Sequence, residues 1–337
     1  MRRILWTLPL SALGAALAIA PQAAAQTAPP PADPDSILTI QVENDAVSTL
    51  KGTSDQYYTS GVRLGWTSPT EWDAGASDLA RSVWGDGTTR VSLDLVQSLF
   101  TPHNTQIDPP NPSDRPYAGE LLLTGGLIHD SATTRDLFDI TLGVVGPAAL
   151  GEEVQNGFHN IIGDTPNRGW HYQIADQPAF ELLDQRIWRL ALADFGLVQT
   201  DVLPSVTAAV GDVRDYVQAG AILRIGQGLA SDFGPSRIAP GLSGTDAYLS
   251  TQDFAWYAFA GADGQAVGYD VSLDGSTFRK NSASVPRIWD VGEAEAGLAI
   301  LVAGFRVSYT QTWQTQEFKG ARSGLFNFGS LTLSAKF

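Results

Sequence analysis

The chain of 337 residues carries 36 acidic and 21 basic residues, a formal net charge of −15, and contains no cysteine. This excess of negative charge argues against nucleic acid as a partner. The lack of cysteine excludes disulfides and zinc sites built on thiolates. Carboxylates gathered at a site would instead attract a divalent cation.

The first 25 residues have the pattern of a secretory signal peptide. Arg2 and Arg3 precede an apolar stretch, 4–20, and the small residues Ala23 and Ala25 predict cleavage after Ala25. A membrane anchor is the alternative, but the stretch is short for a bilayer-spanning helix of about 20 residues. A proline-rich lead, 26–35, would follow. Residues 36–337 are expected to form a single domain, because they contain no internal repeat and no second linker.

From residue 36 onward, apolar and polar side chains alternate with the period of two that is typical of β-strands. In the first such segment Leu38, Ile40 and Val42 share one face, and polar residues occupy the other. We expect about twelve strands, at 36–45, 57–69, 90–101, 117–128, 136–146, 178–191, 196–210, 216–227, 253–271, 287–302, 304–318 and 325–337.

The strand pattern predicts an all-β fold, an integral outer-membrane antiparallel β-barrel of about 12 strands. The strands are many and long, aromatic residues stand near their ends, and the chain finishes on Phe337. Alternation does not reveal which face is buried, so a soluble β-sandwich remains an alternative. In a barrel with both termini in the periplasm, every second connection faces outward. The segment 228–252 should then be a periplasmic turn, and it is long for one.

A single helical segment, 149–162, interrupts the strands on an outward connection, so a short helix is expected at the extracellular rim. Apolar residues recur in it at helical spacing, and Gly163 would end it. Gln155 and His159 stand four residues apart, so both can address one point. Histidine is the common general base for activating water. A solvated histidine on a loop helix is the plainer interpretation of the same residues.

Strand parity places Asn44, Asp45 and Thr59 at the same rim as His159. Asn44 and Asp45 offer the oxygen ligands that calcium takes, and Ca²⁺ can polarise an ester carbonyl. A G-x-S-x-G sequence is absent, so a serine hydrolase of that type is not expected. These residue types together favour hydrolysis of an ester by a histidine and a calcium ion.

Several blocks of sequence, taken in order, resemble one known family. They are "ENDA" (43–46), "DQYYTSGVRLGW" (55–66), "SLFTP" (98–102), "DRPYAGELL" (114–122) and "GPAALGEEVQNGFHNIIGDTPNRGW" (146–170). From about residue 37 to the C-terminus the chain is similar to the outer-membrane lipid A 3'-O-deacylases. The resemblance implies a twelve-stranded barrel and calcium-dependent hydrolysis of the 3'-linked acyloxyacyl group of lipid A by a water-activating histidine. The implied partners are the outer membrane and the lipopolysaccharide of its outer leaflet.

The resemblance also implies roles for particular positions. His159 matches the catalytic histidine, Gln155 its helical neighbour, and Thr59 a threonine of the site. Asn44 and Asp45 match the asparagine–aspartate pair at the calcium site.

Two positions depart from the family. Where the family has a glutamate after the histidine, this chain offers Asp164, which is one methylene shorter and displaced by one position; we expect it as a third metal ligand. A family lysine has no equivalent, and Arg90 and Arg115 are the cations offered instead. Arg115 would either contact a lipid phosphate or pair with a rim carboxylate. The alternative function is a non-catalytic outer-membrane barrel, either a narrow pore or a structural protein.

Overall fold

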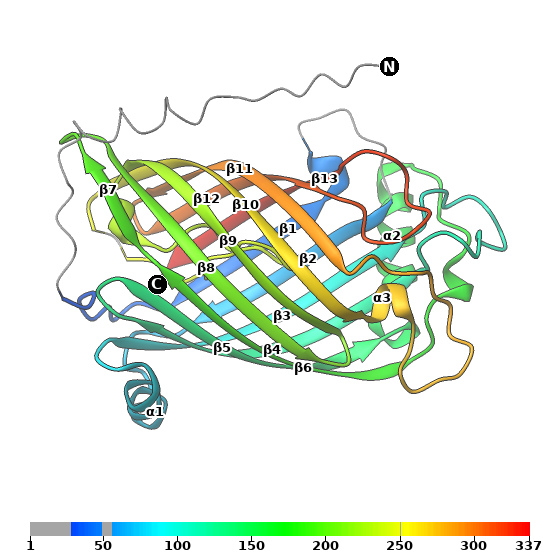
Figure 1. The fold of residues 1–337 in the computed structure, drawn as a ribbon, viewed down its shortest axis with the longest axis horizontal. Helices are drawn as coiled ribbons and strands as arrows, with labels where there is room; N and C mark the ends of the chain where they lie inside the picture. The colour runs from blue at the N-terminus through cyan, green and yellow to red at the C-terminus, as the bar shows by residue number, and fades with distance from the viewer. Residues whose placement is uncertain (1–27, 49–55, 250) are drawn as a thin grey trace, which may run out of the picture.

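The computed structural model describes residues 28–48, 56–249 and 251–337. They form an antiparallel β-barrel whose strands are tilted across the molecule, with helices at both ends (Figure 1). The expected signal peptide, 1–25, lies outside the described residues. Within these ranges no helix is long and apolar enough to cross a membrane.

The wall of the barrel is closed by pairing of β1 with β13 and of β6 with β8. The short β7 pairs with β8 and continues the register in which β6 pairs with β8. Ile187 of β6 lies opposite Ser205, and Leu190 of β7 lies opposite Val202. The wall therefore has twelve strands, with β7 as an extension of β6, and this confirms the predicted fold. The strands are β1 Ile37–Asn44, β2 Tyr57–Thr67, β3 Thr88–Thr101, β4 Ala118–Asp130, β5 Thr134–Val145, β6 Gln177–Trp188, β7 Leu190–Asp194, β8 Gln199–Gly211, β9 Arg214–Gln227, β10 Phe254–Asp270, β11 Asp290–Val302, β12 Phe305–Gln314 and β13 Phe326–Lys336.

The apolar side chains of the wall face outward. In β1, Leu38 and Ile40 are 50% and 48% exposed, whereas Thr39 and Gln41 are fully buried. A soluble sandwich would show the reverse, because exposed leucine and isoleucine stripes are favourable only against hydrocarbon. The exterior is therefore the lipid-facing surface, and the sandwich alternative is wrong.

Exposed aromatic side chains mark both ends of this surface, as in membrane barrels, where they lie at the two lipid–water interfaces. Those at one end are Trp72, Phe195, Phe254, Phe305 and Phe337. Those at the other end are Phe158, Tyr172, Phe180, Phe278 and Trp289.

The connections after β1, β3, β5, β8, β10 and β12 share the end that lies on the right in Figure 1, called here the outer end. Helices α2 (Gly151–Ile162) and α3 (Val271–Asp274) lie there. Helix α1 (Ala74–Trp84) lies at the opposite, inner end. The sequence analysis predicted one helix, which is α2, and it did not predict α1. Asp73 caps it by accepting a hydrogen bond from Ala76 N at 2.7 Å.

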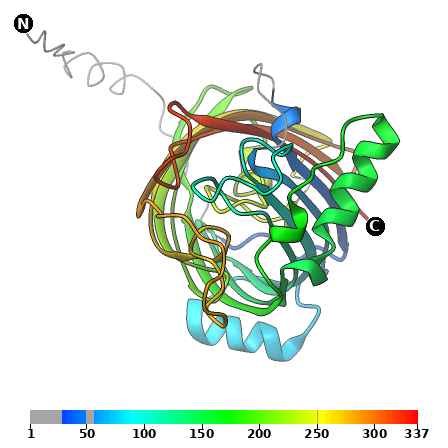
Figure 2. The ribbon, with the colours of Figure 1, turned by 90° about the vertical axis from the view of Figure 1, so that its right-hand side faces the viewer.

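The connection from β9 to β10 starts and ends at the inner end but folds back inside the barrel (Figure 2). Its residues bond to lumen-facing side chains of separate strands. Gln41 Nε2 of β1 donates to Ser236 O at 2.9 Å, and Arg63 Nη2 of β2 donates to Asp246 Oδ1 at 2.7 Å. Arg237 Nη1 donates to Glu293 Oε2 of β11 at 2.9 Å. Residues 229–249 are called the plug below, and their place in the lumen explains why this turn is so long.

Candidate functional site

Helix α2 lies across one side of the outer end (Figure 2). The chain enters it through Leu150, in the left-handed region at φ 59°, and leaves it through Gly163 at φ 76°. Glu152 and Glu153 occupy the first turn, where carboxylates are favourable near the positive end of the helix dipole. The predicted helix and its glycine terminus are confirmed.

The two faces of α2 differ in chemistry. Gln155 and His159 are each 5% exposed, whereas Phe158 and Ile161 are 58% and 84% exposed. The apolar face continues the lipid-facing exterior at the level of the outer aromatic residues. The helix therefore holds His159 inside the protein, directly behind a surface that hydrocarbon can cover.

A backbone carbonyl orients the ring of His159. The ring Nδ1 lies 2.9 Å from Thr165 O. A carbonyl only accepts, so Nδ1 carries the proton of this bond, and in the neutral ring Nε2 is then the unprotonated nitrogen. This tautomer presents Nε2 as the proton acceptor.

Gln155 is held by a buried tryptophan. Its Oε1 accepts a hydrogen bond from Trp170 Nε1 at 2.8 Å, and the Trp170 ring is stacked at a tilt against Tyr117, with ring centroids 5.0 Å apart. Gly151 permits this packing, since a Cβ there would lie 2.8 Å from the Trp170 ring. Gln155 Nε2 is a buried donor with no acceptor among the described residues. One turn of helix separates it from His159, on the same face.

Asn44 and Asp45 stand at the outer end of β1. Asn44 is half-buried, and Asp45 is buried at the start of a 3-10 turn, Asp45–Val47. Asp45 Oδ2 accepts from Gln56 N at 3.1 Å, and Gln56 Oε1 accepts from His103 Nδ1 at 2.7 Å. This link from Asp45 to His103 was not predicted, because its members come from two connections, β1–β2 and β3–β4, with no shared periodicity.

Thr59 is 1% exposed in β2, and its Oγ1 lies 2.7 Å from Thr101 Oγ1 of β3. The register of the two strands shifts between Tyr58 and Ser60, which places the bulge at Thr59 itself. Thr59 is thus part of the wall at the outer end, on the strand that pairs with β1.

Asp164 is exposed directly after α2, and its Oδ1 accepts from Thr165 N at 2.7 Å. It therefore flanks the carbonyl that orients His159. Within the described ranges no three histidine, aspartate or glutamate side chains lie close enough to share a metal ion. The predicted calcium ligands Asn44, Asp45 and Asp164 include only two carboxylates, so this absence does not test them. The calcium site therefore stays a prediction. Its amide and carboxylate oxygens fit the chemistry of calcium.

The two arginines offered in place of the family lysine lie elsewhere. Arg115 is 1% exposed and donates to the carboxylate of Glu317 and, at 2.6 Å, to Ser272 Oγ. The expected pairing with a rim carboxylate is confirmed. Arg90 lies at the inner end of β3 and donates to Asp33 Oδ2 at 2.5 Å. The suggestion that Arg90 serves the outer site is wrong, because it stands at the wrong end of its strand.

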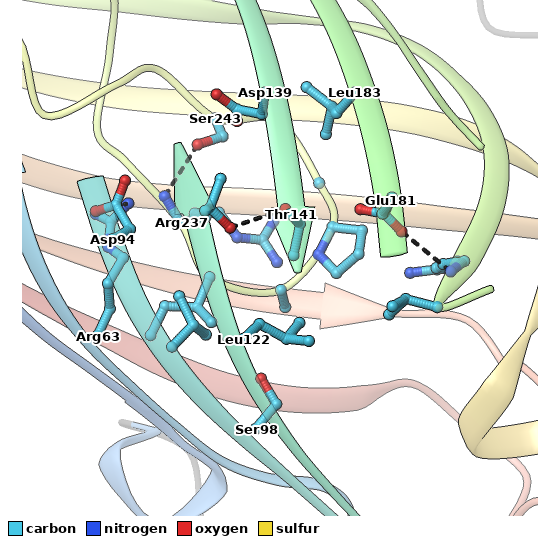
Figure 3. Close-up of a pocket in the computed structure, with 18 of the residues that line it drawn as sticks. Arg63, Asp94, Ser98, Leu122, Asp139, Thr141, Glu181, Leu183, Arg237 and Ser243 are labelled. Atoms are coloured by element: carbon cyan, nitrogen blue, oxygen red, sulfur yellow. Dashed lines mark hydrogen bonds and ion pairs between the residues drawn. The ribbon is translucent and has the colours of Figure 1, made fainter. Parts of the chain in front are cut away.

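A cavity of about 240 Å³ lies between the plug and the wall, lined by charged side chains that include Arg63, Asp94, Asp139, Glu181 and Arg237 (Figure 3). Arg115 lines it, whereas the predicted catalytic and metal residues do not: Asn44, Asp45, Thr59, Gln155, His159 and Asp164. The α2 site is thus a rim site, separate from the lumen.

Comparison with known proteins agrees with this architecture. The chain matches the family model described as outer membrane protein LpxR over residues 10–337. It is similar in fold to LpxR from Salmonella typhimurium, with a TM-score of 0.73 and 22% identity over 89% of this chain and 100% of that one. The β domain of the Bordetella autotransporter BrkA gives a TM-score of 0.45 and 10% identity over 90% of this chain and 100% of that one. No curated protein matches the sequence. The barrel, its lipid-facing exterior and the match over nearly the whole length show that this chain belongs to the LpxR family of bacterial outer membrane proteins.

Proposed function

We propose that this protein is a calcium-dependent esterase that removes the 3'-linked acyloxyacyl group of lipid A from the outer leaflet. Family membership supports lipid A as the substrate. The observation that carries the proposal is the hydrogen bond from His159 Nδ1 to Thr165 O, on a buried helix face directly behind a lipid-facing surface.

In this reaction His159 Nε2 accepts a proton from water while the water oxygen bonds to the acyl carbon. The bond from that carbon to the sugar oxygen then breaks, and His159 returns the proton to the sugar oxygen. Gln155 Nε2 supplies a buried N–H on the same face for the oxygen that gains negative charge. A bound calcium ion would supply polarisation of the ester carbonyl, held by Asn44 and Asp45 with Asp164 as a further ligand. Thr59 lies in the adjoining wall.

A pore has less support, because the plug bonds to strands around the lumen. Glu43 of β1 accepts from Ile238 N and Ala239 N at 2.9 Å each, and Arg135 of β5 donates to Ala247 O at 2.9 Å. An open water-filled path would require this segment to leave.

The proposal is tested by mass spectrometry of lipid A. The lipid A is extracted from cells that express the parent chain, cells that express its His159→Ala variant, and cells that express neither. The expected result is loss of the mass of the 3' acyloxyacyl group with the parent chain alone. Heat-modifiable migration on gels establishes that both barrels are folded. An unchanged lipid A spectrum with a folded parent barrel would favour the non-catalytic barrel.

A further inference from the structure

The exposed cations of this acidic protein are gathered at one end. Ion pairs hold twelve of the 18 lysines and arginines in the described part of the chain, and Arg189 donates to Asp232 O at 2.6 Å. The exposed cations without an ion pair in the described part of the chain all lie in outer connections: Arg168, Arg279, Lys280, Lys319 and Arg322. Among the described residues, exposed positive charge without an ion pair therefore lies only on the side of the membrane that bears lipopolysaccharide.

Four of these cations, Arg279, Lys280, Lys319 and Arg322, belong to two connections, 271–289 and 315–325, that pack together as one unit. Lys319 N donates to Pro286 O at 2.8 Å, and Ile288 N donates to Glu317 O at 2.7 Å. Beneath them lies a buried apolar cluster formed by Tyr57, Leu273, Val285 and Phe318. The four cations are thus presented on a folded surface, called here the basic rim.

The basic rim carries no exposed carboxylate of its own. The two acidic residues in these connections are both engaged by arginine, Asp274 with Arg287 at 2.8 Å and Glu317 with Arg115. The nearest exposed carboxylate in sequence is Asp290, at the start of β11. The net charge that the rim presents to solvent is therefore positive.

The height of the basic rim matches lipid headgroups. Trp289 is 65% exposed immediately before β11, and Leu325 is 58% exposed immediately before β13. Exposed tryptophan in a barrel marks the boundary between hydrocarbon and headgroups. The four cations lie in the connections rather than in the membrane-spanning strands, which places them at the boundary with the headgroups, where lipid phosphates lie.

Figure 2 shows the two connections, gold and red, on the left of the barrel mouth and α2, green, on the right. The connection that contains α2 bears the opposite charge, with Glu152, Glu153, Asp164 and Asp176 all exposed. The basic rim is therefore a surface apart from the His159 site.

We propose that the basic rim binds the phosphate groups of outer-leaflet lipopolysaccharide, at a site separate from the one that cleaves the ester. Charge complementarity and the height of the rim select an anionic lipid headgroup. Each cation close to an anionic membrane surface strengthens binding about fivefold, so four of them give a surface that depends strongly on charge and on salt.

The test measures binding of lipid A to the full-length folded barrel by native mass spectrometry in detergent. All proteins carry His159→Ala, so that the lipid is not hydrolysed. Bisphosphorylated and dephosphorylated lipid A are compared, and the difference between them is the phosphate-dependent binding. One variant removes the charge, Arg279→Gln/Lys280→Gln/Lys319→Gln/Arg322→Gln. Its matched control retains it, Arg279→Lys/Lys280→Arg/Lys319→Arg/Arg322→Lys.

We expect phosphate-dependent binding to weaken roughly 600-fold, about fivefold for each of the four cations, in the neutralised variant and to persist in the charge-retaining one. Equal binding by parent and neutralised variant would overturn the proposal. So would equal loss in both variants, or displacement of the lipid by an equal concentration of inorganic phosphate. The result does not depend on esterase activity, so failure of the proposed function would leave it unchanged.

Discussion

Asp232 ties the plug to the barrel wall, and its removal has a calculable effect. The carboxylate is fully buried and accepts from Arg224 Nη1 at 2.7 Å and Tyr257 OH at 2.9 Å. Arg306 Nη1 lies 3.4 Å from Asp232 Oδ2, the oxygen that also accepts from Tyr257. Asp232→Ala leaves two buried guanidinium groups without this shared partner.

Removing one member of a buried ion pair costs about 3–5 kcal/mol. Two contacts reduce the cost here. Arg224 keeps Asp201 at 2.6 Å, and Arg306 keeps Asp246 at 3.5 Å. We therefore expect about 3 kcal/mol, which raises the population with a displaced plug roughly 150-fold.

Urea unfolding in detergent micelles, followed by tryptophan fluorescence, measures the free energy of unfolding, and conductance in planar bilayers measures opening of the lumen. The matched control is Asp194→Ala, a half-buried carboxylate outside any ion pair of the described residues, in the β7–β8 hairpin, that accepts from Gly196 N at 2.7 Å. It should change stability by less than about 1 kcal/mol and leave conductance unchanged. If the two variants lose the same stability and neither conducts more than the parent, the plug is not held by Asp232.

Other predictions concern the proposed site. His159→Ala should lower deacylation about 10²–10⁴-fold in a barrel that still migrates as folded, and near-full activity would show that another group is the base. Excess chelator should stop deacylation and calcium restore it, with magnesium a poor substitute; undiminished activity in chelator would remove the metal from the mechanism. Asp45→Ala with His159→Ala should be little worse than the poorer single variant, and multiplicative losses in initial rate would refute a shared site. Trp170→Phe removes a buried donor at a cost of about 1–3 kcal/mol and should slow deacylation about 10–100-fold, so a rate equal to that of the exposed control Tyr172→Phe would contradict its positioning role.

Local sequence determined the strands and the helix at the rim. Alternation of period two located all twelve strands of the wall, and the helical spacing before Gly163 located α2. These features follow from backbone geometry, because each depends on residues within one or two turns or a few strand positions. The placement of His159, Asn44, Asp45 and Thr59 at one end followed equally, from strand parity alone.

The alternation in β1 is equally compatible with either face being buried, and only closure of the barrel assigns Thr39 and Gln41 to the lumen and Leu38 to lipid. Likewise, the polar, glycine-containing segment 228–252 has no periodicity of its own. Residues 229–249 of this segment form the plug because their charged and backbone groups bond to strands that are distant in sequence, as Asp232 does with Arg306. Such partners are set by which strands surround the lumen, and a local pattern of residues contains no information about that arrangement.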